Sequence, residues 1–181
     1  MNDAAPAAET PAGEAAPDAG HRERLVRVVL AGEALTRLSP ILEADRAQAV
    51  ADLESENRFA PVTPRLRETG ADGPFVLHLS IQEGRLVFDI KAEDDAPLGA
   101  IVLALGPFRA LIKDYQLLVD SHMKAVEEGR EARIQAIDMG RRGLHNEGAN
   151  LMIERLEGKI GMDFETARRL FTLVCVLHQR I

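Results

Sequence analysis

The chain has 181 residues and a formal net charge of −7 at pH 7, and its length fits one domain with or without a tail. Four of the seven negative charges come from acids in the first twenty residues, which leaves −3 on the remainder. A charge of this size disfavours nucleic-acid binding, which needs a basic surface.

Residues 1–21 have the composition of a disordered, acidic, Ala/Pro-rich tail. They cannot bury enough apolar surface to offset the entropy lost on ordering, so we expect one α+β domain over residues 22–181. No secretory or transit signal and no apolar run of membrane-spanning length is present. The single cysteine, Cys175, rules out a disulfide framework. These features predict a cytoplasmic protein with no membrane partner.

The first third of the domain predicts a strand, a helix and a loop. Residues 24–30 (RLVRVVL) form a short β-rich run, which predicts the strand. Ser39 and Pro40 are a hydroxyl N-cap and a proline at the first helical position, which predicts a helix to about residue 57. Residues 59–73 contain two prolines and two glycines and predict the loop.

Alternating apolar residues in 75–81 and 86–90, with Glu83 and Gly84 between them, predict a β-hairpin with one buried face. Residues 99–105 are apolar on both faces, which suggests a more central strand. The links between these strands are too short for crossover connections, so we expect an antiparallel sheet.

Three helices are predicted in the C-terminal half. Apolar residues recur at helical spacing from Phe108 to Val126, and a second helical pattern over residues 130–157 is interrupted or kinked by glycines. The third helix begins at Asp163, a good N-cap, and residues 170–177 (LFTLVCVL) are apolar nearly all round. Such a helix is buried in its own core or in a dimer interface. The predicted fold class is α+β: a small antiparallel sheet with one inserted helix, followed by a helical C-terminal half.

Residues 136–148 (AIDMGRRGLHNEG) concentrate charged and polar side chains between glycines. On one continuous helix, Asp138, Arg141, Arg142 and His145 fall within roughly 100° of one another and border an apolar stripe. Two guanidinium groups can bind a phosphate or carboxylate bidentately, and a histidine can add a donor. If the glycines break the helix, Asn146 can cap a new helix whose free N–H groups also face the anion. The predicted ligand-binding set is Asp138, Arg141, Arg142, His145, Asn146 and Glu147.

A purely structural interpretation explains the same pattern, and we favour it over a ligand site. Asp138 and Arg142 form an ordinary i, i+4 pair, and glycines on an apolar stripe let another helix approach closely. Elsewhere, Cys175 and His178 are three residues apart on a helix, but no second pair of metal ligands accompanies them. We therefore predict no metal and no cofactor, and we assign no catalytic residue. Sequence motifs of nucleotide-binding proteins, serine hydrolases and zinc proteases are absent.

Five segments together resemble one family: LHLSI (77–81), GRLVFDI (84–90), PFRALIKDY (107–115), IDMGRRGLHNEG (137–148) and ARRLFTLVCVLH (167–178). The similarity runs from about residue 22 to residue 178. The chain thus resembles the uncharacterised bacterial protein family UPF0262. This resemblance implies a compact cytoplasmic protein, and it carries over no activity and no catalytic residue.

Three functions follow as expectations. The first is a non-catalytic binding or regulatory module that self-associates through its helical half. The second is an enzyme acting on a phosphorylated or carboxylated small molecule, with Arg141 and Arg142 binding the anion, His145 as general acid/base, and Asp138 or Glu147 in an orienting role. The third is an RNA- or ribosome-associated factor, which a surplus of only two basic residues from residue 129 onward disfavours. The partners considered are therefore a second copy of the chain and an anionic small molecule, with nucleic acid unlikely.

Overall fold

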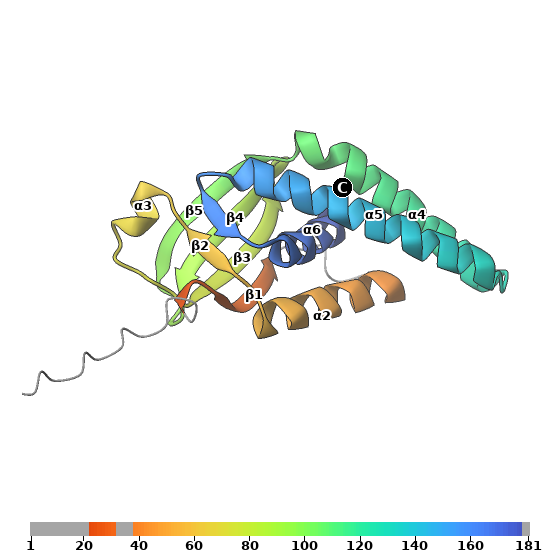
Figure 1. Ribbon diagram of the computed structural model, residues 1–181, viewed down its shortest axis with the longest axis horizontal. Helices are drawn as coiled ribbons and strands as arrows, with labels where there is room; N and C mark the ends of the chain where they lie inside the picture. The colour runs from red at the N-terminus through yellow and green to blue at the C-terminus, as the bar shows by residue number, and fades with distance from the viewer. Residues whose placement is uncertain (1–21, 32–37, 179–181) are drawn as a thin grey trace, which may run out of the picture.

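The computed structural model describes residues 22–31 and 38–178, and the predicted tail over residues 1–21 lies outside these ranges (Figure 1). The elements in chain order are β1 (Leu25–Ala31), α2 (Pro40–Ser55), β2 (Phe59–Pro61), α3 (Pro64–Arg67), β3 (Phe75–Gln82), β4 (Arg85–Ala92), β5 (Pro97–Ala104), the 3-10 turn η2 (Gly106–Phe108), α4 (Arg109–Glu127), α5 (Glu131–Leu156), β6 (Ile160–Met162) and α6 (Phe164–His178).

The main sheet has four strands in the order β1-β3-β4-β5. The pairs β3–β4 and β4–β5 are antiparallel, whereas β1 runs parallel to β3. The α+β class, the inserted helix and the helical C-terminal half are confirmed, but the sheet is mixed instead of wholly antiparallel. The reason is that residues 32–74, including α2, connect β1 to β3, and a connection of this length permits a parallel crossover.

The hairpin of β3 and β4 is confirmed, and its turn has the expected backbone conformation. Gln82 pairs with Arg85, and Glu83 and Gly84 between them have φ angles of 50° and 72°. Two consecutive positive φ angles are the requirement of a two-residue type I′ turn.

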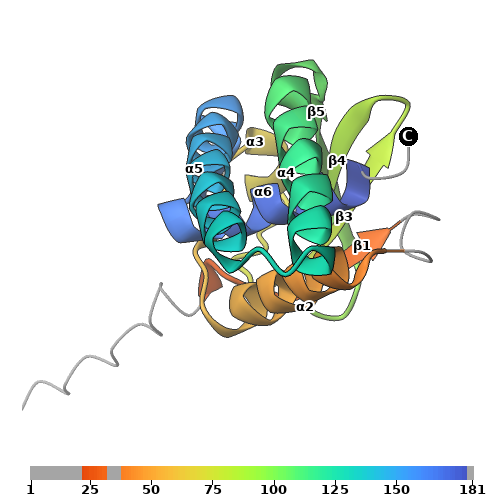
Figure 2. The same ribbon diagram turned by 90° about the vertical axis from the view of Figure 1, so that its right-hand side faces the viewer.

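Strand β5 lies at the edge of the sheet, so the prediction of a central strand was wrong. Ile101 and Leu103 point into the core and are each 6% exposed, whereas Val102 between them is 49% exposed. Apolar residues on both faces of a strand are all buried only when a second layer covers the outer face of the sheet. In the described part of the chain, Figure 2 shows helices on one side of the sheet and none over the other.

The segment predicted as a loop over residues 59–73 holds two short elements instead. β2 pairs antiparallel with β6 in a separate two-stranded sheet, and α3 follows directly. The two prolines that suggested a loop occupy positions that tolerate them. Pro61 ends β2, and Pro64 is the first residue of α3.

The C-terminal helix α6 is the centre of the helical half, with α2, α4 and α5 packed around it (Figure 2). Every residue from 170 to 177 is buried within the single chain, which confirms the own-core alternative for this helix. The predicted N-cap is also confirmed, because the backbone N–H of Thr166 donates to Asp163 Oδ1 over 3.2 Å. None of the helices in the described ranges is long and apolar enough to cross a membrane.

Helix α5 is continuous over its 26 residues, so its glycines do not break it. A Cβ atom added at Gly148 would lie 2.1 Å from a ring carbon of Phe171 on α6. The glycine therefore permits close approach of the two helices, as the structural interpretation of the sequence anticipated.

Candidate functional site

The six predicted site residues separate into two groups along α5. Asp138, Arg141 and His145 are partly buried among the helices. Arg142, Asn146 and Glu147 are exposed. The cluster predicted at the margin of the core therefore forms only in part.

Arg141 is held by two carboxylates of its own chain. Its Nη2 donates to Asp45 of α2, and its Nη1 donates to Asp138 Oδ1 over 3.3 Å. The hydroxyl of Tyr115 on α4 donates to the same oxygen of Asp45. The side chains of Arg141 and Asp45 are only 14% and 18% exposed. Arg141 thus joins three helices through its two Nη atoms, while its Nε is buried and has no hydrogen-bond partner.

This network keeps its proton donors protonated at neutral pH. Burial alone would lower the pKa of Arg141, but the hydrogen bond and charge of Asp45 outweigh burial and raise it. Burial, followed by the charge of Asp45, raises the pKa of Tyr115 and also that of Cys175 on α6. Neither the hydroxyl nor the thiol is therefore an activated nucleophile.

His145 lies between two aromatic rings. Its imidazole stacks on Tyr115 with a centroid separation of 5.4 Å, and it meets Phe171 edge-on at 6.4 Å. Burial, followed by the charge of Arg141, lowers the pKa of His145 to about 4. The ring is therefore neutral at pH 7. Its Nε2 atom is buried and has no hydrogen-bond partner.

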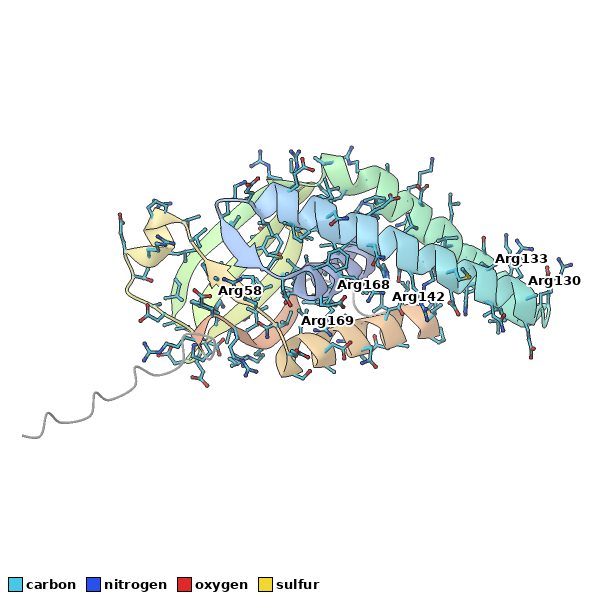
Figure 3. The ribbon with its side chains drawn as sticks, in the orientation of Figure 1. Arg58, Arg130, Arg133, Arg142, Arg168 and Arg169 are labelled. Atoms are coloured by element: carbon cyan, nitrogen blue, oxygen red, sulfur yellow. The ribbon has the colours of Figure 1, made fainter. Side chains whose placement is uncertain are left out.

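A pocket of about 180 Å³ opens beside His145, between α2, α5 and α6. Neither Arg141 nor Arg142 lines it. All but one of the residues that form its wall have polar side chains: Asp45, Gln48, Ala49 and Asp52 of α2, His145 of α5, and Glu165, Arg168, Arg169 and Thr172 of α6. Figure 3 shows Arg142, Arg168 and Arg169 along one side of the molecule, beside the space between α2 and α5.

The two arginines of α6 are held differently. Arg169 donates from Nη1 to the carbonyl oxygen of Glu56 over 2.8 Å, and its Nε lies 3.8 Å from Asp52 Oδ2. Arg168 has Nη1 at 3.7 Å from Glu165 Oε2, which is an ion pair too long for a hydrogen bond. Its Nε is buried and has no partner. Arg168 therefore faces the pocket with unused donor capacity.

The sequence prediction missed Arg168, Arg169, Asp45 and Tyr115. One signal for the first two was available, because residues 168–169 are a doubled arginine just like residues 141–142. Asp45 and Tyr115 carry no local signal, since their roles depend on contacts between distant helices. Among the described residues, no three His, Cys, Asp or Glu side chains gather as a metal ion would require.

A second, larger pocket of about 430 Å³ lies between β2 and α3 and contains none of the predicted residues. We place the candidate site in the smaller pocket because two unpartnered buried nitrogen atoms belong to residues of its wall.

These features define a class of α+β protein in which three helices line a small pocket next to a partly buried ion pair. The family model described as "Uncharacterised protein family (UPF0262)" matches residues 22–180. The chain belongs to this family, which confirms the resemblance found in the sequence.

Its relatives are similar over most of their length. A UPF0262 protein of Granulibacter bethesdensis is 71% identical over 162 residues, which cover 88% of this chain and 92% of the relative. A UPF0262 protein of Acidiphilium cryptum is 60% identical over 159 residues, covering 88% and 94% of the two chains. One of Rhodopseudomonas palustris strain BisB5 is 49% identical over 155 residues, covering 86% and 91%. No solved structure matches the chain.

Proposed function

We propose that the protein is a cytoplasmic, non-catalytic binding protein for a small phosphate or carboxylate anion. The anion occupies the pocket between α2, α5 and α6, and Arg168 and His145 are its main contacts. One observation carries this proposal. Arg168 Nε and His145 Nε2 are both buried without a partner, and both residues line the same pocket. A buried polar group left without a hydrogen bond costs about 1–3 kcal/mol, so a ligand that bonds to both atoms is favoured.

Two arginines at or beside the pocket have guanidinium donors that no carboxylate uses in full. Each carboxylate in its wall already faces a guanidinium group: Asp45 pairs with Arg141, Asp52 with Arg169, and Glu165 with Arg168. Arg142 lies three residues before His145 on α5, on a neighbouring part of the helix surface, and forms no ion pair with any described residue. Asp138 also pairs with Arg141, so the charges in and around the pocket cancel, and an anion is favoured by the unused donors of Arg168 and Arg142 instead of by a net positive charge.

The electrostatics of the site support binding more than catalysis. A general acid/base works best with a pKa near the working pH, and the pKa of His145 lies near 4 because of burial and then Arg141. Tyr115 and Cys175 keep their protons for the reasons given above. The enzyme alternative would need a different base, and the three carboxylates of the pocket wall are each paired with an arginine.

The sequence predicted self-association because α6 is apolar nearly all round. The burial of this helix within one chain removes that argument for a second copy. Residues 170–177 are buried inside one chain, so α6 needs no second copy to cover it. Light scattering coupled to gel filtration tests the oligomeric state on its own. A dimer at tens of micromolar would place the contact outside α6.

The binding proposal is tested by thermal unfolding at pH 7.5 with inorganic phosphate, sugar phosphates, nucleotides and small carboxylates. A ligand at one hundred times its Kd stabilises the folded state by about 2.7 kcal/mol. We expect at least one of these anions to stabilise the wild type and Arg168→Gln to weaken its binding at least tenfold.

The matched control is Arg133→Gln, which changes an exposed arginine of α5 that does not line the pocket. It should bind as the wild type does. The proposal fails if no anion stabilises the wild type, or if the two variants lose the same affinity.

A further inference from the structure

We propose that the pocket between β2 and α3 binds a small apolar monocarboxylate, with its carboxylate on Arg67. The pocket has a volume of about 430 Å³, which is within the roughly 300–1,000 Å³ typical of small-molecule sites. It shares no residue with the pocket beside His145, so this site is independent of the function proposed above.

The floor of this pocket is apolar. Phe75 of β3, Leu66 of α3 and Ala60 of β2 line it and are 4%, 5% and 6% exposed. Leu98 of β5 and Ala71 add partly buried apolar surface. A ligand that covers these side chains removes apolar area from water, which favours an aliphatic or aromatic body.

The charged groups at the pocket leave one cation without a partner. Arg22 Nη1 lies 3.3 Å from Asp72 Oδ2, and Glu23 Oε2 lies 3.6 Å from Arg58 Nε, so three of the four charged lining residues are already paired. The fourth is Arg67, which is exposed and forms no ion pair with any described residue.

A single free guanidinium group beside an apolar floor matches a ligand with one negative charge and an apolar body. Arginine binds a carboxylate bidentately, which also fixes the orientation of the ligand. A nucleotide or other polyanion fits less well, because its further charges would approach Glu23 and Asp72. The charge pattern therefore selects a monocarboxylate.

The test compares octanoate with 1-octanol, which has the same chain length and no charge. Binding to the full-length protein is measured by isothermal titration calorimetry at pH 7.5. We expect octanoate to bind the wild type and 1-octanol to bind at least tenfold more weakly. Arg67→Gln should reduce the affinity for octanoate at least tenfold and leave that for 1-octanol unchanged.

The matched control is Arg65→Gln, since Arg65 lies two residues earlier in α3, is exposed, and does not line the pocket. It should bind octanoate as the wild type does. The inference is overturned if octanoate does not bind at millimolar concentration, or if Arg65→Gln and Arg67→Gln weaken binding equally. Arg168→Gln should leave octanoate binding intact, which separates this site from the anion pocket.

Discussion

Asp45 of α2 and Arg141 of α5 form an ion pair between residues 96 positions apart in the chain. Less than a fifth of either side chain is exposed to solvent. The pair joins two helices at the edge of the pocket beside His145, and Tyr115 of α4 adds a third helix to the same carboxylate. Loss of Arg141 would leave Asp45 as an uncompensated charge in a mostly buried setting, and loss of the Asp45 charge would leave Arg141 with only the half-exposed Asp138.

We therefore expect Asp45→Asn to lower the free energy of unfolding by about 3 kcal/mol, as measured by urea denaturation. Replacing both partners, with Asp45→Asn and Arg141→Met together, should destabilise less than the sum of the two single changes. The control is Glu43→Gln, which breaks the exposed pair of Glu43 with Arg46 and should have no measurable effect. If Asp45→Asn were as neutral as this control, the pair would not stabilise the helix junction.

Alanine substitutions at two glycines of α5 should change the free energy of unfolding in opposite directions. Gly148→Ala places a methyl group against the Phe171 ring and should destabilise by about 3 kcal/mol, because the tightly packed helices must separate. Gly143 has no atom within 4 Å of an added Cβ, so Gly143→Ala should stabilise by about 1 kcal/mol through helix propensity. Thermal unfolding of the two variants checks this contrast. Equal effects would show that α5 does not approach α6 as described.

His145 should make stability depend on pH. The folded protein protonates this ring only near pH 4, because of burial and then Arg141, whereas an unfolded histidine protonates near 6.5. Between these values the unfolded chain binds more protons, so the free energy of unfolding falls as the pH falls. From pH 7.5 to 5.0 the contribution of this one histidine is about 2 kcal/mol.

Urea denaturation of wild type and His145→Gln at both pH values measures this contribution. Burial, and then Arg109, lowers the pKa of His178 in the same direction, so the difference between the two proteins isolates His145. The variant should lose less stability than the wild type on acidification. Parallel losses would mean that the folded protein protonates His145 as readily as the unfolded chain does.

A charge in the middle of α6 should prevent folding. Leu173 and Val174 are both 0% exposed within one chain, so Leu173→Glu or Val174→Glu buries a carboxylate without a partner, at a cost of several kcal/mol. Circular dichroism should show loss of the cooperative transition. Val126→Glu, at a position of α4 that is 55% exposed, should fold normally. A well-folded Leu173→Glu monomer would contradict the burial of α6.

Local patterns in the sequence predicted the longer helices and strands, but not the short β2, α3 and β6 and not which elements lie side by side. The β3–β4 hairpin, α5, α6 and the Asp163 cap all follow from periodicity and turn residues within a few positions. The parallel pairing of β1 with β3 and the edge position of β5 depend on which distant segment lies alongside. The sequence of residues 99–105 does not indicate whether another layer covers the outer face of β5.

The same limit applies to the candidate site. On one continuous helix, spacing placed Asp138, Arg141, Arg142 and His145 at the margin of the core; three of them are partly buried there and Arg142 is exposed. The sequence could not show that Asp45 pairs with Arg141, or that Arg168 on α6 adds an unpartnered donor to the wall of the pocket. These facts arise only when three helices meet.

The position of α6 has a consequence for synthesis of the chain. α6 packs against α2, α4, α5 and β3, and all four are translated before it. Their apolar faces emerge from the ribosome with no central helix to cover them until residues 164–178 follow. The nascent chain therefore stays incompletely packed through most of translation, and a premature stop before this helix leaves a product suited to proteolysis rather than to function.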